Sequence, residues 1–183
     1  MPLTKAKFRE NCLQKMKNLP RHNSLYKNSL LNKKLLQELK KYKNKNILFY
    51  YPMGFEADIR KVLYKIRQTN NVYLPFMVEQ SFKMVPFRLP LKKKKFGIFE
   101  AGNTLRNINK IDIAIVPSVG VDYNLQRVGF GKGMYDRFFE KLQKKPYTIF
   151  IQPELCYTRK KVCDSYDISC DLLLTPKVKL VKK

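Results

Sequence analysis

Three alternate glycines and three cationic residues share one short segment of the chain. Residues 127–137 read Arg-Val-Gly-Phe-Gly-Lys-Gly-Met-Tyr-Asp-Arg, after a strand-like run and before a helix-like run. Glycine lets backbone N–H groups approach anionic oxygens closely, and the start of a helix adds partial positive charge. Lys132 and Arg127 can add full charges, although the spacing matches neither G-x-G-x-x-G nor G-x-x-x-x-G-K-[ST]. The segment predicts a phosphate-binding loop, with a flexible loop that only caps the helix as the alternative.

A lysine and an arginine lie on the apolar side of the first expected helix. At about 100° per residue, Lys5 and Arg9 fall within the arc covered by Phe8, Cys12 and Met16. Both cations should therefore point toward the body of the protein, where a buried charge needs a partner. A polyphosphate is one such partner, and side chains that reach solvent from the edge of the stripe are the alternative.

The glycine segment belongs to a longer motif. The motif begins with Asp-Ile-Ala-Ile-Val-Pro-Ser-Val-Gly-Val-Asp at residues 112–122 and continues through residues 127–138. It resembles the signature of the 5-formyltetrahydrofolate cyclo-ligase family, and weaker similarity runs from Lys5 to Asp171. Members of that family close 5-formyltetrahydrofolate to 5,10-methenyltetrahydrofolate with Mg-ATP and release ADP and phosphate. The resemblance therefore implies an ATP-dependent ligase that forms a C–N bond.

The resemblance also implies which residues serve each ligand. For catalysis it implies Lys132, Arg127 and Tyr135. For ATP it implies Lys5, Arg9, Arg127, Val128, Gly129, Phe130, Gly131, Lys132, Gly133, Met134 and Tyr135. For the folate substrate it implies Tyr51, Glu56, Met84, Phe96, Phe130, Gly131, Lys132, Gly133 and Met134. For Mg²⁺ it implies Asp136 and Asp167, with Asp164 as the alternative to Asp167.

Some of these residues also have simpler interpretations. Asp136, one turn into a helix, could serve only to stabilise the positive helix end, and Glu56 could do the same at the start of another helix. For Glu56 the resemblance implies instead a contact with the pterin, where a carboxylate can accept two N–H bonds. Met84 and Phe96 could be ordinary core residues.

The reaction that the resemblance implies needs no nucleophile from the protein. The formyl oxygen attacks the γ-phosphate of ATP, N10 of the substrate then attacks the formyl carbon, and phosphate leaves. Such phosphoryl transfer depends on positioning and on neutralising charge. The chain has a single histidine, His22, and no G-x-S-x-G motif, which disfavours hydrolases that use a serine or cysteine with a histidine base.

The net charge of +24 favours a polyanionic partner. A basic RNA-binding protein is therefore one alternative, but the lysine runs at 92–95 and 182–183 contain no aromatic residues that could stack on bases. We instead expect ATP and a polyglutamylated 5-formyltetrahydrofolate as ligands, and no nucleic acid. A catalytically weak folate-binding paralogue is the other alternative, since Met134, Val121 and Tyr166 depart from the family pattern.

Length and composition indicate one domain, residues 1–183, with 44% hydrophobic residues. No apolar run approaches the roughly 20 residues of a membrane span, and the N-terminus has no signal-peptide pattern. We therefore expect a cytoplasmic monomer or weak dimer without a membrane partner. The spacing of the four cysteines is typical of neither a disulfide framework nor a zinc module, so we expect reduced cysteines that serve mainly in packing. They are Cys12, Cys156, Cys163 and Cys170.

Helical and strand patterns alternate along the chain. Helices are expected within residues 4–20, 24–42, 59–66 and 134–143. Strands are expected at 47–51, 72–74, 111–116, 147–151 and 171–174, with a hairpin across 76–88. This order favours an α/β fold, a single three-layer domain with a mostly parallel sheet flanked by helices on both faces. The resemblance implies the same architecture, a Rossmann variant similar to sugar-phosphate isomerases. Ligands of such sheets bind beyond the carboxyl ends of the strands, here around residues 52–56, 75–77 and 117–136.

Overall fold

Helices and strands alternate along the chain, as the sequence pattern predicts. The computed structural model describes residues 3–19, 21–94, 99–105, 108 and 110–182. The helices are α1 (Lys5–Lys17), α2 (Arg21–Leu39), α3 (Arg60–Ile66) and α4 (Met134–Glu140). The strands are β1 (Asn46–Leu48), β2 (Asn71–Val78), β3 (Ser81–Pro86), β4 (Lys92–Lys93), β5 (Phe99–Glu100), β6 (Ile113–Pro117), β7 (Gly120–Val121), β8 (Arg127–Val128), β9 (Tyr147–Ile151), β10 (Leu172–Leu174) and β11 (Lys179–Val181).

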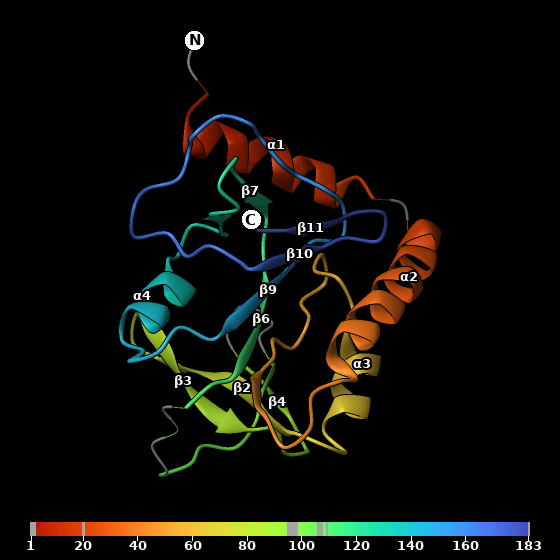
Figure 1. Ribbon diagram of the computed structural model, residues 1–183, viewed down its shortest axis with the longest axis vertical. Helices are drawn as coiled ribbons and strands as arrows, with labels where there is room; N and C mark the ends of the chain where they lie inside the picture. The colour runs from red at the N-terminus through yellow and green to blue at the C-terminus, as the bar shows by residue number, and fades with distance from the viewer. Residues whose placement is uncertain (1–2, 20, 95–98, 106–107, 109, 183) are drawn as a thin grey trace.

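A seven-stranded sheet forms the centre of the molecule (Figure 1). Its strand order is β11-β10-β9-β6-β1-β2-β3, and two short two-stranded sheets, β4-β5 and β7-β8, accompany it. Strands β10, β9, β6, β1 and β2 run parallel, whereas the edge strands β11 and β3 pair antiparallel with their neighbours. Ile113 of β6 is in register with Ile47 of β1 and Tyr147 of β9. The carboxyl ends of parallel strands meet at one edge, so the loops that follow β1 and β6 lie close together.

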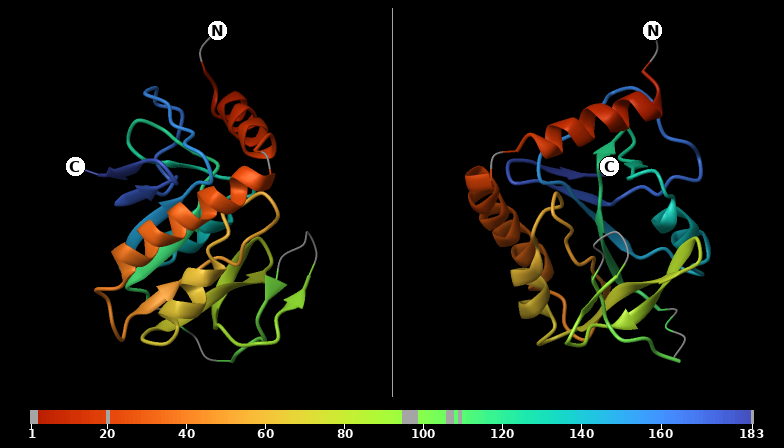
Figure 2. Two further views of the ribbon diagram at one scale, coloured as in Figure 1. Left: turned by 90° about the vertical axis from the view of Figure 1, so that its right-hand side faces the viewer. Right: turned by 180° about the vertical axis from the view of Figure 1, so that it is seen from behind.

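Both faces of the sheet are covered. Successive residues of a strand point to opposite faces, so Ile47 packs with the apolar residues of α2 and α3, whereas Leu48 packs with Phe138 and Phe139 of α4. The views in Figure 2 show α2 and α3 together on one side of the sheet. The expected three-layer α/β architecture, with a mostly parallel sheet and helices on both faces, is confirmed.

Helix α1 lies across one end of the sheet rather than along a face (Figure 1). Thr4 caps the helix, as its Oγ1 accepts a hydrogen bond from Lys7 N over 3.2 Å. The predicted stripe of Phe8, Cys12 and Met16 is buried and packs with a separate apolar cluster that includes Val119 and Val128. This packing places α1 beside residues 129–133, which directly follow Val128.

Two of the cysteines form a disulfide, so the expectation of four reduced cysteines is wrong. Cys12 of α1 is bonded to Cys156, with the two Cα atoms 5.7 Å apart and a separation of 144 positions in sequence. Cys163 and Cys170 are free and buried, as expected. Spacing along the chain could not reveal the pair, because the fold alone brings α1 onto the segment that follows β9.

Some element boundaries differ from the expected ones. α2 ends at Leu39, where a turn with a hydrogen bond from Tyr42 N to Leu39 O begins, because the lysine run 40–45 supplies few apolar positions. α4 ends at Glu140 and is seven residues long. β11 was not expected, since a lysine-rich edge strand lacks a clear apolar alternation. None of the helices in the described part of the chain is long and apolar enough to cross a membrane.

Candidate active site

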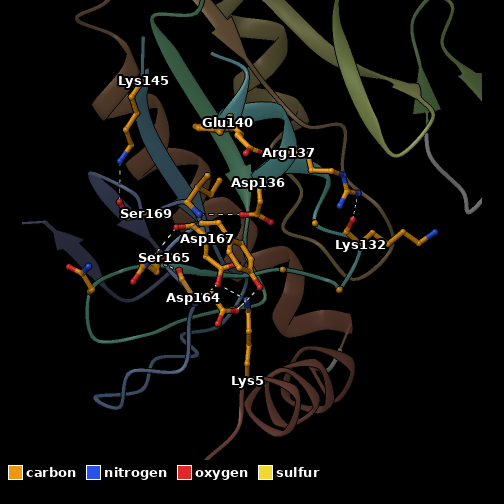
Figure 3. A pocket seen from close by; sticks show the side chains of 18 of the residues that line it. Lys5, Lys132, Asp136, Arg137, Glu140, Lys145, Asp164, Ser165, Asp167 and Ser169 are labelled. Carbon is orange, nitrogen blue, oxygen red and sulfur yellow. Dashed lines mark hydrogen bonds and ion pairs between the residues drawn. The ribbon is translucent and has the colours of Figure 1, made fainter. Parts of the chain in front are cut away.

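A cavity of about 1080 Å³ lies between α1, the glycine segment, α4 and the loop 164–169 (Figure 3). We call residues 129–133 the glycine loop. Lys5 and Arg9 of α1, the glycine loop and Asp136 of α4 contribute to the wall of this cavity, as does Asp167. The structure therefore brings together cations and carboxylates that the sequence separates by more than a hundred residues.

The two cations of α1 face the cavity, as the helical pattern predicts. Lys5 Nζ lies 2.9 Å from Asp164 Oδ2 and 2.5 Å from Asp167 Oδ2. Burial lowers the pKa of Lys5, but hydrogen bonds to the two aspartates outweigh it and raise the pKa above its ordinary value. Arg9 Nε donates a hydrogen bond to Gly129 O over 2.8 Å. α1 thus contacts both the glycine loop and the loop 164–169.

Arg127 is a buried cation behind the glycine loop. Its side chain is 4% exposed, and its Nε donates to Pro117 O over 2.9 Å. The Nη1 atom lies 3.8 Å from Asp136 Oδ2, and the guanidinium carbon lies 4.9 Å from the centre of the Tyr135 ring. Burial lowers the pKa of Arg127, and the charge of Asp136 opposes that effect. A Cβ atom at Gly129 would lie 2.5 Å from Nη1, so a side chain at this position would have to displace the buried guanidinium of Arg127.

The glycine loop combines an unusual backbone with an exposed lysine. Gly131 has a φ angle of 102°, which residues with a side chain rarely adopt. Lys132 is exposed, and in Figure 3 its side chain extends away from Lys5 and Asp167. Phe130 packs against Phe55, with ring centres 5.3 Å apart. Because α4 is so short, its helix dipole is small, and the charged side chains carry more of the expected phosphate binding.

Asp136 and Asp167 lie close together on the cavity wall. Asp136 Oδ1 accepts a hydrogen bond from Ile168 N over 3.2 Å, and Asp167 Oδ2 accepts one from Asp164 N over 2.7 Å. The described residues contain no group of three or more His, Cys, Asp or Glu side chains that could hold a metal. Two carboxylates beside a group of cationic side chains nevertheless fit Mg²⁺, which uses one or two carboxylates together with substrate phosphates. The buried position of Asp167 and its proximity to Asp136 favour it over Asp164.

Glu56 lines a second cavity of about 310 Å³, between α1, α2 and the loop after β1. Its Oε2 accepts a hydrogen bond from Met53 N over 2.9 Å. Burial raises the pKa of Glu56 to about 7, although the Met53 N–H and the charge of Arg127 oppose the increase. α3 begins only at Arg60, so the interpretation of Glu56 as a residue that opens a helix is wrong.

The other residues expected at the folate site lie in different surroundings. The Tyr51 ring contacts the Phe99 ring, with centres 5.4 Å apart. Met84 is 2% exposed within the hydrophobic core, and neither Tyr51 nor Met84 lines the two cavities. Phe96 lies outside the described residues. Their contacts with folate remain predictions.

Sequence reasoning missed residues that hold the cavity wall in place. Gln126 Nε2 donates to the carbonyl oxygens of Asp164 (2.8 Å) and Asp167 (3.2 Å), which fixes the loop that bears both aspartates. Arg137 Nη2 donates to Lys132 O over 2.5 Å. Gln126 directly precedes the segment 127–137, and Arg137 is its last residue. Their position beside the glycines is the only feature of the sequence that could have indicated their role.

Comparisons with known proteins agree on one family. The sequence model described as "5-formyltetrahydrofolate cyclo-ligase family" matches residues 3–176. A 5-formyltetrahydrofolate cyclo-ligase of Haemophilus influenzae is 31% identical over 127 residues, which cover 64% of this chain and 66%, just under two thirds, of that protein. A probable 5-formyltetrahydrofolate cyclo-ligase of Schizosaccharomyces pombe is 27% identical over 165 residues, covering 78% of this chain and 81% of that protein.

Solved structures show the same fold. The NMR structure of Aquifex aeolicus 5,10-methenyltetrahydrofolate synthetase matches with a TM-score of 0.78 at 24% identity, covering 99% of this chain and 94% of the other. A 5,10-methenyltetrahydrofolate synthetase from Mycoplasma pneumoniae matches with a TM-score of 0.74 at 22% identity, covering 96% of this chain and 100% of the other.

Proposed function

The chain belongs to the 5-formyltetrahydrofolate cyclo-ligase family, and we propose that it converts 5-formyltetrahydrofolate to 5,10-methenyltetrahydrofolate, with ATP and Mg²⁺, and releases ADP and phosphate. One observation carries the proposal: α1, the glycine loop and the loop 164–169 contribute cations and carboxylates to the same large cavity. This is the arrangement that a magnesium–nucleotide complex requires, with positive charge for the phosphates and carboxylates for the metal.

The triphosphate of ATP would lie between α1 and the glycine loop. Lys5 and Arg9 already face this space, and the exposed Lys132 can turn toward it. Lys5 would then contact phosphate oxygens instead of Asp164 and Asp167. Asp167, released from Lys5, could hold Mg²⁺ together with Asp136. When bound there, Mg²⁺ would neutralise phosphate oxygens and orient the γ-phosphate for attack.

The folate substrate would enter from the side of Glu56. The charges of Glu56 and Arg127 affect each other, and the Phe55–Phe130 contact connects the loop after β1 to the glycine loop. A pterin held by Glu56 would therefore extend toward the phosphates, with its formyl group near the glycine loop. Ionised Glu56 can accept two N–H bonds from the aminopyrimidine edge of the pterin.

The residues around the glycine loop would position the reacting groups and neutralise their charge. The formyl oxygen attacks the γ-phosphorus, N10 closes the ring at the formyl carbon, and phosphate leaves with the former formyl oxygen. Arg127 is held rigidly by Pro117 O, so its charge needs little reorganisation as negative charge develops. Tyr135, whose pKa is raised by burial, remains a neutral hydrogen-bond donor beside it.

The positive charge of the chain also fits the proposed ligands. ATP and a polyglutamylated folate are both polyanions, and a net charge of +24 would attract both. We propose that the protein acts on polyglutamylated 5-formyltetrahydrofolate in the cytoplasm, as a monomer or weak dimer.

The activity can be tested by optical absorbance. The protein is mixed with Mg-ATP and 5-formyltetrahydrofolate, and formation of the methenyl product is followed in the near ultraviolet, with ADP and phosphate measured in parallel. Equal amounts of methenyl product, ADP and phosphate are expected, and none when ATP or magnesium is omitted. Folate binding without product would support the weak paralogue instead.

A further inference from the structure

Arg137 is the last residue of the segment 127–137 and belongs to α4. Its side chain turns back toward the glycine loop (Figure 3). Its guanidinium donates through Nε to Gln80 O over 2.8 Å, and Nη2 donates to the same oxygen. Nη2 also donates to Lys132 O over 2.5 Å. One side chain therefore joins two backbone segments that are about fifty residues apart.

The Gln80 end of this connection is the turn between β2 and β3. Glu79, the other turn residue, has a φ angle of 49°, so the turn has a defined backbone shape. Ser81 Oγ donates to Met134 O over 3.4 Å, and the Phe82 ring stacks on the Phe138 ring with centres 4.2 Å apart. The hairpin is thus packed against α4, and its turn lies beside the glycine loop.

The connection depends on the shape of the guanidinium group. Arginine presents several N–H donors in a planar fork, which can serve two carbonyl oxygens at once, whereas lysine presents a compact ammonium. The bonds are charge-assisted and join backbone oxygens, so they fix the position of the chain at Lys132 whatever its side chain does.

We propose that Arg137 is a positioning residue, which holds the glycine loop against the β2–β3 turn and thereby sets the geometry of the ATP site. The inference rests on the proposed function of the loop. It goes beyond that function because Arg137, which is not among the residues expected to contact ATP or folate, holds the loop in place. Arg137 acts through the backbone of Lys132.

The test combines hydrogen exchange with kinetics in two variants and a control. Arg137→Met keeps much of the side-chain volume but removes every N–H donor. Arg137→Lys keeps the positive charge and the N–H donors of an ammonium group, but not the planar fork. Arg159→Ala removes an exposed arginine on the segment after β9 and serves as the matched loss of charge. In Arg137→Met, amide exchange in residues 129–133 and 79–81 should rise about tenfold or more, because charge-assisted bonds are lost. The KM for ATP should rise by a similar factor. In Arg137→Lys, both the amide exchange and the KM for ATP should lie between those of the wild type and Arg137→Met. Both quantities should be unchanged in Arg159→Ala.

Unchanged exchange in the glycine loop of Arg137→Met overturns the proposal, as does an unchanged KM for ATP. Exchange that rises uniformly over the whole chain also overturns it, because Arg137 would then serve only general stability. The exchange measurement needs no substrate, so it tests the connection even if the wild-type protein fails to cyclise the folate.

Discussion

Replacing Glu56 by glutamine should stabilise the protein at alkaline pH while it impairs folate use. Burial raises the pKa of Glu56 from an ordinary value of 4.5 to about 7. Between these two values the folded protein keeps a proton that the unfolded chain has lost, so the free energy of unfolding falls as pH rises through this window. It then stays level above about pH 7.

The size of the effect follows from the pKa change. A tenfold change in an acid dissociation constant is worth about 1.4 kcal/mol, so ionising buried Glu56 costs roughly 3 kcal/mol of stability at the upper limit. A glutamine stays neutral, and its carbonyl oxygen can still accept the hydrogen bond from Met53 N. Glu56→Gln should therefore match the wild type near pH 4 and exceed its stability by up to roughly 3 kcal/mol near pH 8.

Urea unfolding followed by circular dichroism measures this difference, since the chain has no tryptophan to report it. Glu10→Gln, which changes an exposed glutamate on α1, is the matched control and should show no such pH dependence. The variant should also lose folate affinity at pH 8 with little change toward ATP, because an amide N–H would face the N–H groups of the pterin. Equal stability of wild type and Glu56→Gln at every pH would show that burial does not raise the pKa of Glu56.

The remaining predictions concern the charged residues and the disulfide. Lys132→Ala should raise the KM for ATP about tenfold or more without a change in melting temperature. Arg127→Ala should in addition lower stability by about 1–3 kcal/mol, because it leaves Pro117 O buried without its donor, and thermal unfolding of the two variants would reveal the contrast. Asp136→Asn should lose most activity at low magnesium and partly regain it at high magnesium, and a flat magnesium titration would remove Asp136 from the metal site. Cys12→Ser, or reduction of the wild type, should lower stability by as much as about 5 kcal/mol, as expected for a cross-link that closes a long loop, and identical urea midpoints would contradict this.

The fold was largely predictable because its signals are local. The alternation of helices and strands predicted the parallel sheet with helices on both faces, and the stripe of Phe8, Cys12 and Met16 correctly oriented α1. The lysine-rich edge strand β11 was missed, because pairing with β10 rather than its own sequence makes it a strand. The apolar positions correctly placed a helix at 59–66, but the interpretation of Glu56 as the residue that opens it was wrong, because α3 begins at Arg60.

The sequence indicated which residues lie at the candidate site, but not which residues they contact there. Helical spacing indicated that Lys5 and Arg9 face inward, and the glycine motif identified the loop they approach. The ion pairs of Lys5 with Asp164 and Asp167, and the Cys12–Cys156 bond, join residues more than 140 positions apart, which only the fold brings together. The burial of Arg127 could not be foreseen either, since arginine side chains are mostly exposed.

The central claim, that the formyl oxygen attacks the γ-phosphate of ATP in this site, can be tested by isotope transfer. The substrate is prepared with a heavy oxygen isotope in the formyl group and incubated with the protein and Mg-ATP in ordinary water, and the phosphate released is analysed by mass spectrometry. We expect one labelled oxygen in each phosphate, formed together with one methenyl product. Unlabelled phosphate, with the heavy oxygen recovered in water, would show that the formyl oxygen does not attack ATP.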